Sequence, residues 1–205
     1  EVFFFIAAIW MSGLLGKNEQ ASNQIALNLS SMTFMVAMGF SVVAMIRIGE
    51  MFGKSDIINL KKIAYSLFLI ILLFDLFFCI IFLVFSEYLP WIYLSKTADK
   101  SISDVFQVIE ISSKLILISG VFQIFDGLQA VVLGVLRGIQ DVFIPTVLIF
   151  IAYILVGLPV SYYLGLNTYL GVVGIWIGLL IGLVSSSIFL LLRFKYDLNF
   201  ILNNK

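Results

Sequence analysis

The stretch of this sequence with the most chemical potential is Phe122–Gln129, where polar residues interrupt an apolar run. Gln123 and Gln129 lie three residues before and after Asp126, so their side chains favour neighbouring faces of one helix. Phe122 precedes Asp126 by one helical turn. A carboxylate, two amides and an aromatic face could together bind a partly dehydrated cation, or a proton on Asp126. The alternative is a buried Asp that only hydrogen-bonds to a neighbouring helix.

Two further acidic residues, Glu1 and Asp75, also lie in apolar surroundings. A charged side chain at the centre of a bilayer costs about 2.5–3.5 kcal/mol on insertion scales, so it persists where it has a partner or faces a water-filled cavity. Glu1 is either such a functional residue or the boundary residue of an ordinary helix. Asp75 has no polar neighbour at helical spacing, so it is either structural or pairs with another helix.

The composition indicates an integral membrane protein that must position these residues on helices. Apolar residues make up 62% of the 205 residues and charged residues 12%, about half the charge of a typical soluble domain. Uncharged runs between charged clusters predict six transmembrane helices: 2–15, 24–46, 63–85, 105–136, 143–166 and 172–192. The runs lack the alternation of barrel strands. The first run is shorter than the roughly 20 residues of a full span, so we expect it to be truncated.

Small residues recur at helical spacing and predict a single six-helix bundle. Gly174, Gly178 and Gly182 repeat every four residues on the sixth predicted helix. Such faces let helix backbones approach closely. Gly157 and Pro159 predict a kinked or loosened fifth helix.

The distribution of Lys and Arg predicts the orientation in the membrane. With Lys114 left out because it lies within the fourth predicted helix, eight of these residues fall on one side and three on the other. The first set is Arg47, Lys54, Lys61, Lys62, Arg137, Arg193, Lys195 and Lys205; the second is Lys17, Lys96 and Lys100. Since cytoplasmic loops carry the excess of positive charge, we expect the first side and both chain ends to be cytoplasmic.

Several functional classes are disfavoured. Twelve basic residues balance twelve acidic ones, which argues against a nucleic-acid partner. The absence of histidine removes imidazole catalysis and the usual zinc sites. The single Cys79 is expected to be a packing residue. No phosphate-binding loop or nucleophile motif is present, so we expect neither an enzyme nor a bound cofactor.

A set of short motifs, taken in order, resembles the C-terminal half of the multidrug and toxic compound extrusion (MATE) transporters. They cover essentially the whole chain and look like helices seven to twelve of that family. The motifs are QIALN at 24–28, SSMTFM at 30–35, RIG at 47–49, FQIFDGLQ at 122–129, GVLRG at 134–138 with QD at 140–141, GLP at 157–159 and GIW at 174–176.

The resemblance implies an all-α membrane protein that forms half of a twelve-helix fold. Residues 1–205 would be the C-terminal six-helix bundle, with the N-terminal bundle, absent from this chain, as its partner. Members of the family are secondary antiporters that export amphipathic, often cationic drugs across the inner (plasma) membrane in exchange for Na⁺ or H⁺. The expected partners are therefore the lipid bilayer and small-molecule drugs.

In the NorM-like branch, the family's cation site pairs a Glu on helix seven with an Asp and an aromatic residue on helix ten. Glu1, Asp126 and Phe122 fall on these positions, so the resemblance implies that a Na⁺ ion could bind at Asp126 and Glu1. Phe122 departs from the tyrosine of the family pattern and lacks its hydroxyl oxygen. Gln123 and Gln129 would be polar residues near the site.

Two other functions remain open on sequence grounds. One is a lipid-linked oligosaccharide flippase of the same superfamily, although the acidic midspan residues favour a cationic cargo. The other is a membrane subunit that does not transport and only packs against partners.

Overall fold

The computed structural model describes residues 2–94 and 102–203, and these residues form helices and turns without any strand. The long uncharged runs have no alternative to helix, because a backbone in lipid must satisfy its own hydrogen bonds. The elements in chain order are α1 (Val2–Leu15), α2 (Lys17–Gly53), α3 (Ile57–Phe85), α4 (Trp91–Leu94), α5 (Ile102–Gly138), α6 (Phe143–Phe150), η1 (Ile151–Gly157), α7 (Leu158–Leu166) and α8 (Val172–Asn203).

The prediction of a six-helix membrane bundle is confirmed. Among the described residues, five helical segments are long and apolar enough to cross a membrane, and α1 is a shorter apolar helix. The segments α6, η1 and α7 follow one another without a break and together form the predicted fifth span. Helices α2 and α8 extend beyond the predicted apolar runs, because charged residues mark the membrane boundary and not the end of a helix.

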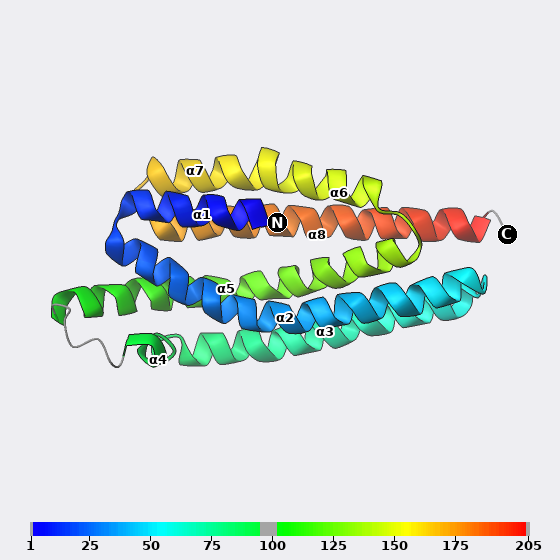
Figure 1. Cartoon of the computed structure of the whole chain (residues 1–205), viewed down its shortest axis with the longest axis horizontal. Helices are drawn as coiled ribbons and strands as arrows, with labels where there is room; N and C mark the ends of the chain where they lie inside the picture. The colour runs from blue at the N-terminus through cyan, green and yellow to red at the C-terminus, as the bar shows by residue number, and fades with distance from the viewer. Residues whose placement is uncertain (1, 95–101, 204–205) are drawn as a thin grey trace.

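The helices lie roughly side by side along the long axis of the molecule (Figure 1). Helices α2, α3 and α5 form one side of the bundle, and α6, η1 and α7 form the opposite edge, with α1 and α8 between them. Helix α5 packs against α2, α3 and α8, so it connects the two sides. This central position places the polar side chains of Gln123, Asp126 and Gln129 inside the bundle.

The connections are divided between the two ends of the bundle. The α2–α3 turn, the α5–α6 connection and the end of α8 lie at one end, whereas the α1–α2 and α7–α8 turns lie at the other (Figure 1). Helix α1 begins about midway along the bundle. The described basic residues that the sequence assigns to one side lie on segments at the first end: Arg47, Lys54, Lys61, Lys62, Arg137, Arg193 and Lys195.

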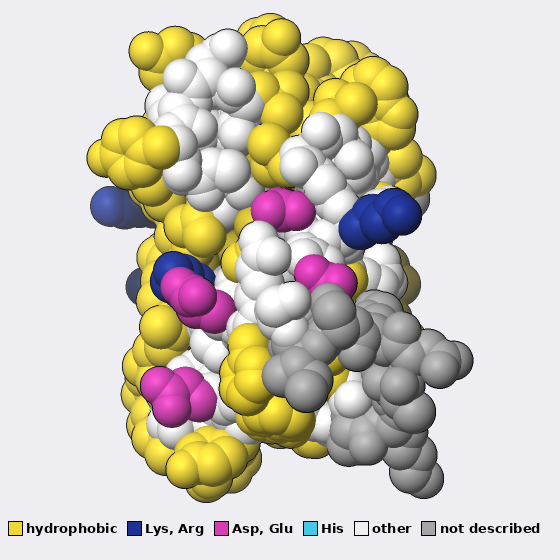
Figure 2. Space-filling view, turned by 90° about the vertical axis from the view of Figure 1, so that its left-hand side faces the viewer, with side chains coloured by type: hydrophobic (Ala, Val, Ile, Leu, Met, Phe, Trp, Pro, Cys, Tyr) yellow, Lys and Arg dark blue, Asp and Glu magenta, His cyan; other side chains and the backbone are white. Residues whose placement is uncertain are grey.

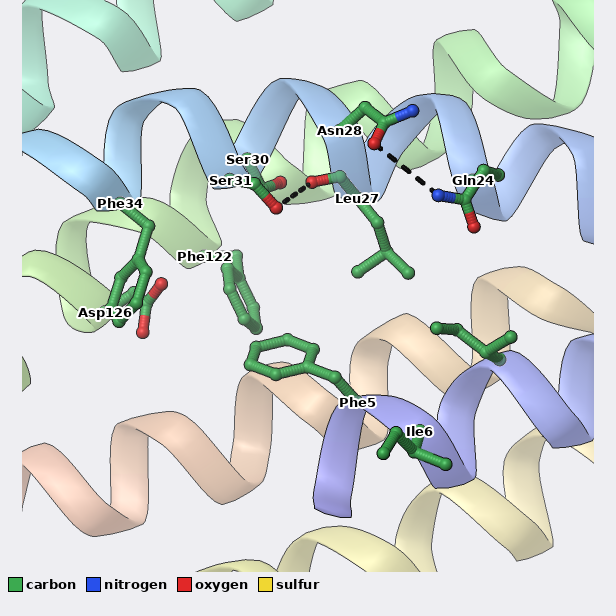
Figure 3. A pocket seen from close by; sticks show the side chains of 11 residues that line it. Phe5, Ile6, Gln24, Leu27, Asn28, Ser30, Ser31, Phe34, Phe122 and Asp126 are labelled. Carbon is green, nitrogen blue, oxygen red and sulfur yellow. Dashed lines mark hydrogen bonds between the residues drawn. The ribbon is translucent and has the colours of Figure 1, made fainter. Parts of the chain in front are cut away.

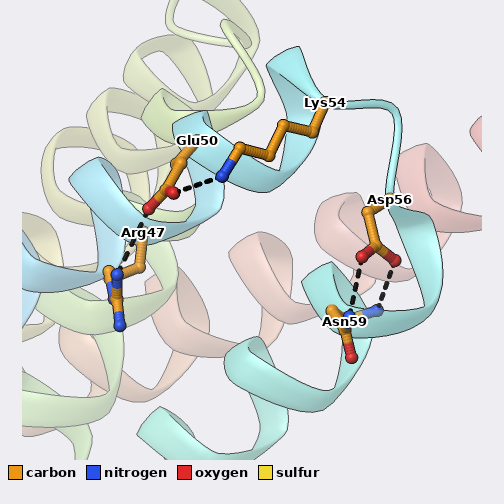
Figure 4. A network of polar contacts seen from close by, with 5 residues as sticks. All are labelled: Arg47, Glu50, Lys54, Asp56 and Asn59. Atoms are coloured by element: carbon orange, nitrogen blue, oxygen red, sulfur yellow. Dashed lines mark hydrogen bonds and ion pairs between the residues drawn. The ribbon is translucent and has the colours of Figure 1, made fainter.

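The α2–α3 turn is a compact polar corner at this end (Figure 4). Glu50 pairs with Arg47, Oε2 to Nη1 at 3.2 Å, and with Lys54, Oε1 to Nζ at 2.6 Å. Asp56 caps α3: its Oδ1 accepts from the backbone N–H of Asn59 at 3.1 Å, and its Oδ2 accepts from the Asn59 amide at 2.7 Å. The cap satisfies a backbone donor that the first turn of a helix leaves unpaired.

Small residues bring helices α7 and α8 into close contact, as the glycine spacing predicts. A Cβ atom on Gly178 would overlap the backbone of Ser161, and one on Gly174 would overlap the backbone of Leu164. A Cβ on Gly182 would lie 3.0 Å from the Cα of Gly157. Helix α8 therefore packs backbone against backbone along this face.

The predicted irregularity in the fifth span takes the form of a π-helical segment, η1, directly before Pro159. Proline has no N–H group, so the carbonyl of Leu155 loses its usual partner and the local winding widens. Tyr153 lies in this segment, and its side chain is buried at 3% exposure.

Figure 2 views the end that carries the α1–α2 and α7–α8 turns. Hydrophobic side chains form much of the outline of the bundle. Acidic side chains lie near the middle and the lower left of this face, and basic side chains lie toward its left and right edges. On the long sides, α3 exposes Leu69, Leu73, Leu76 and Ile80 at helical spacing. An apolar flank with polar ends is the arrangement that a bilayer requires.

Candidate functional site

A cavity of about 350 Å³ lies between α1, α2 and α5 (Figure 3). This volume falls in the range of sites for small molecules. Its lining is aromatic and aliphatic with a few polar groups: Phe5, Ile6, Ile9, Gln24, Leu27, Asn28, Ser30, Ser31, Phe34, Phe122 and Asp126.

Helix α5 contributes Phe122 and Asp126, whose spacing of one turn places both in this cavity. Both side chains are largely buried, at 1% and 5% exposure. Asp126 is the one charged residue among the described residues that line the cavity. In Figure 3, Asp126 lies beside the ring of Phe34, and Phe122 points toward Phe5. The site therefore offers a single carboxyl group among aromatic rings.

Neighbouring rings hold Phe122 in place. Its ring centroid lies 6.0 Å from that of Phe5, with the planes at 66°, and 5.6 Å from that of Trp176. Trp176 is itself fixed by a hydrogen bond from its indole Nε1 to Asn23 Oδ1 at 2.8 Å. Packing thus sets the orientation of the ring without the hydroxyl group that a tyrosine would supply.

Helix α2 contributes a neutral polar stripe at positions 24, 28 and 31. The Gln24 amide donates to Asn28 Oδ1 at 3.5 Å, and the Ser31 hydroxyl donates to the carbonyl of Leu27 at 2.7 Å (Figure 3). In the sequence, these residues stand out only as part of the motifs shared with the family. Positions 24 and 28 are four residues apart, and positions 28 and 31 are three apart, so their side chains lie on one face of a helix. This pattern within an apolar run could have predicted that they line one wall of a cavity.

Gln129 lies apart from this cavity. Its side chain is fully buried, and its Oε1 accepts a hydrogen bond from the Tyr153 hydroxyl at 2.9 Å. The ring of Tyr153 stacks on that of Phe4, with centroids 4.7 Å apart and planes at 14°. Tyr153 was not expected at the site, because it comes from the π-helical segment of another span.

Gln123 and Asp75 meet at the interface of α3 and α5. The Gln123 amide Nε2 donates to the backbone carbonyl of Asp75 at 3.5 Å. Both residues border a narrow void that Asp126 also lines. Asp75 therefore has polar neighbours on another helix, which its own helical spacing could not reveal.

Glu1 lies outside the described residues. Within the described part of the chain, no three His, Cys, Asp or Glu side chains cluster closely enough to hold a metal ion. Among the described residues, the hydroxyl and amide groups of the α2 wall are the candidate neutral ligands for a Na⁺ ion at Asp126.

Comparison with known proteins agrees with this architecture. The family model described as MatE matches residues 1–163. A probable multidrug resistance protein NorM of Agrobacterium fabrum is 34% identical over 194 residues, covering 95% of this chain and 41% of the relative. The multidrug resistance protein MdtK of Yersinia enterocolitica is 35% identical over 200 residues, covering 96% and 42%.

The fold is also found among solved structures. The crystal structure of the eukaryotic MATE transporter AtDTX14 superposes with a TM-score of 0.84 at 21% sequence identity, covering 94% of this chain and 41% of that one. The chain thus spans about two-fifths of the length of the relatives it matches. With a family match over most of its length and a bundle that superposes on a solved member, this chain belongs to the MATE family of multidrug efflux transporters.

Proposed function

We propose that this chain is the C-terminal half of a secondary active antiporter that exports amphipathic, often cationic drugs or toxic metabolites in exchange for Na⁺ or H⁺. The observation that carries the proposal is the cavity in which Asp126 is the one charged group among the described lining residues, surrounded by aromatic rings. Such a cavity suits an apolar molecule with a positive charge, because the rings and the carboxylate both attract cations.

Exchange follows if the drug and the coupling ion compete for the same carboxylate. An ion changes the balance between two conformations only if it binds one of them more tightly. Asp126 is the strongest candidate for this differential contact, with Glu1 as a second carboxylate and Phe122 as the adjacent aromatic group. The coupling ion would be cargo and not a resident cofactor.

The other six-helix bundle is the proposed partner. Helices α1 and α2 expose large apolar side chains next to the cavity, among them Ile6, Trp10, Met32 and Met35 at 56–75% exposure. A second bundle placed over these faces would enclose the drug path between the two halves. We place the complete transporter in the inner (plasma) membrane, with the Arg47–Lys62 turn in the cytoplasm.

The test is drug efflux from energised cells that carry the complete transporter with Asp126→Asn. This change keeps the side-chain shape but removes the charge, so we expect ion-driven efflux to be abolished and membrane insertion to be retained. Glu110→Gln is the matched control, since Glu110 is exposed and pairs only locally with Lys114. Efflux at the wild-type level from the Asp126→Asn protein, at equal expression and under both Na⁺ and proton gradients, would refute the proposal.

The flippase function is less well supported. The phosphate groups of a lipid-linked oligosaccharide are anionic, and the described lining of the cavity offers them a carboxylate and no basic side chain. A subunit that only packs against partners would tolerate Asp126→Asn in every transport assay, so the same experiment separates it from an antiporter.

A further inference from the structure

Asp75 and Gln123 present unpaired oxygen atoms inside the bundle. Their side chains are 1% and 3% exposed. For the part of the chain that the structure describes, Asp75 Oδ2 and Gln123 Oε1 have no hydrogen-bond partner, although both atoms are sealed from solvent. Buried polar atoms in folded proteins are almost always paired, so two unpaired acceptors on residues that line the same void indicate that something else satisfies them.

The two residues border one void between α2, α3 and α5. Thr33, Phe34 and Ala37 line it from α2, Asp75 from α3, and Gln123, Asp126 and Gly127 from α5. The void is too narrow to admit a water molecule. Water therefore cannot satisfy the orphaned oxygens.

Gly127 allows Asp75 to reach this position. A Cβ atom on Gly127 would overlap the carboxyl group of Asp75. Because glycine has no side chain, the carboxyl group of Asp75 on α3 can contact the backbone of α5 at Gly127, the residue after Asp126.

A proton is the ligand that fits these atoms. An ionised Asp75 and Gln123 Oε1 would both be acceptors, whereas a protonated Asp75 gains an O–H group that can donate to Gln123 Oε1. The other titratable group on the void is Asp126, and the described lining from α2 and α5 includes no basic side chain. Two ionised carboxylates facing one dry space would repel each other, which again favours a proton on one of them.

We propose that Asp75 is a second proton-binding carboxyl group of the transport site, which exchanges its proton with the drug cavity through Asp126. Asp126 and Phe34 line both the void and the cavity, so they connect the two spaces. The exchange breaks the O–H bond of Asp75 and forms one on the carboxylate of Asp126, which then releases the proton to water in the cavity. This inference rests on the proposed antiport function and extends it to a second carboxyl group.

The test is infrared difference spectroscopy of the complete transporter in lipid nanodiscs, comparing acidic with alkaline buffer. Protonated carboxylic acids give a C=O stretching band that ionised ones lack. We expect Asp75→Asn to lose one such band, and Asp126→Asn to lose a different one. Glu110→Gln is the control for an exposed carboxyl group and should leave both bands in place.

A second variant keeps the test decisive if Asp75→Asn fails to fold. Gln123→Leu retains the Asp75 carboxyl group but removes its proposed acceptor, so the Asp75 band should move to higher frequency. An unchanged spectrum in a folded Asp75→Asn protein, or an unshifted one in Gln123→Leu, would overturn the inference. A band that responds to Na⁺ at constant pH, and not to pH, would also overturn it.

The outcomes separate this inference from the proposed function. If Asp126→Asn abolishes efflux while the Asp75→Asn spectrum matches the wild type, the inference fails and the antiport function stands. If Asp75→Asn loses its band while Asp126→Asn transports normally, the antiport role of Asp126 fails, although Asp75 still binds a proton.

Discussion

At the scale of single residues, the described lining of the cavity between α1, α2 and α5 has one carboxyl group, with apolar groups on one side of it and neutral polar groups on the other. Asp126 lies beside aromatic rings, and amide and hydroxyl groups of α2 face the same cavity. Among the described lining residues Asp126 is the one acidic group, so a cation bound there would contact a single described carboxylate. The ring of Phe122 is the group most suited to contact the organic part of a cationic drug.

Replacing Phe122 with Leu tests this role. The change keeps an apolar side chain but removes the aromatic face. We therefore expect the binding free energy of a cationic drug to weaken by the contribution of one cation–π contact, about 0.5–2 kcal/mol. This corresponds to a fall in affinity of about 2- to 30-fold. Fluorescence polarisation with the purified transporter measures this affinity. Phe106→Leu is the control, since Phe106 is exposed on the same helix. Equal drug affinity in the two variants would contradict the assigned role of Phe122.

Sequence reasoning found those members of the site that share one helix. Phe122 and Asp126 could be paired because a spacing of four residues places side chains on one face. The contact of Asp75 with Gly127 and Gln123, and the hydrogen bond from Tyr153 to Gln129, join residues from different helices. Helix periodicity contains no information about which helix faces which, so these contacts could not be predicted from the sequence.

At the scale of the elements, the apolar runs of the sequence predicted the six spans. They did not predict the residues at which the helices begin and end. Helix α8 continues to Asn203, beyond the predicted end of its span. Arg193 stabilises this extension: its Nε donates to Asp141 Oδ2 at 2.7 Å, and its guanidinium pairs with Asp197 Oδ1 at 3.0 Å. The short helix α4 was not predicted, because four residues are too few to show a period.

The close packing of α7 and α8 makes Gly178 sensitive to any side chain. In Gly178→Ala the added methyl group would overlap the backbone of Ser161, so the helices must move apart. We expect a loss of about 1–3 kcal/mol in the free energy of unfolding, the usual cost of overpacking. Thermal unfolding in detergent measures it. Gly53→Ala is the control because a Cβ there meets no atom within 4 Å, and a comparable loss in both variants would argue against close packing.

At the scale of the whole molecule, the bundle is asymmetric in charge, and the chain spans about two-fifths of the length of its relatives. The described basic residues named above gather at the end that carries the α2–α3 turn. The opposite end carries the acidic residues Glu19, Glu87, Asp104 and Glu110 and two described basic residues, Lys17 and Lys114. This asymmetry favours a cytoplasmic position for the α2–α3 turn, because the excess of Lys and Arg sets the orientation of a membrane protein.

Cysteine labelling of intact cells tests this orientation. Ser55 lies in the α2–α3 turn, and Tyr169, which is 99% exposed, lies in the α7–α8 turn at the other end. With the native Cys79 replaced by Ala in both variants, we expect a membrane-impermeant maleimide to label Tyr169→Cys and not Ser55→Cys. Labelling of both cysteines after the cells are opened shows that each is reactive. The reverse pattern in intact cells would overturn the proposed topology.

The central claim is that Asp126 couples drug binding to a cation. The most direct measurement is the affinity of the purified, complete transporter for a cationic drug, titrated at rising Na⁺ concentration and, separately, at falling pH. In the wild-type protein we expect the affinity to fall along at least one of these series, because the ion and the drug compete for one carboxylate. In the Asp126→Asn protein, the affinity for the drug should already be lower at low Na⁺ concentration and high pH. It should then stay constant as the Na⁺ concentration rises or the pH falls. Equal ion dependence in the wild-type and Asp126→Asn proteins would contradict the claim.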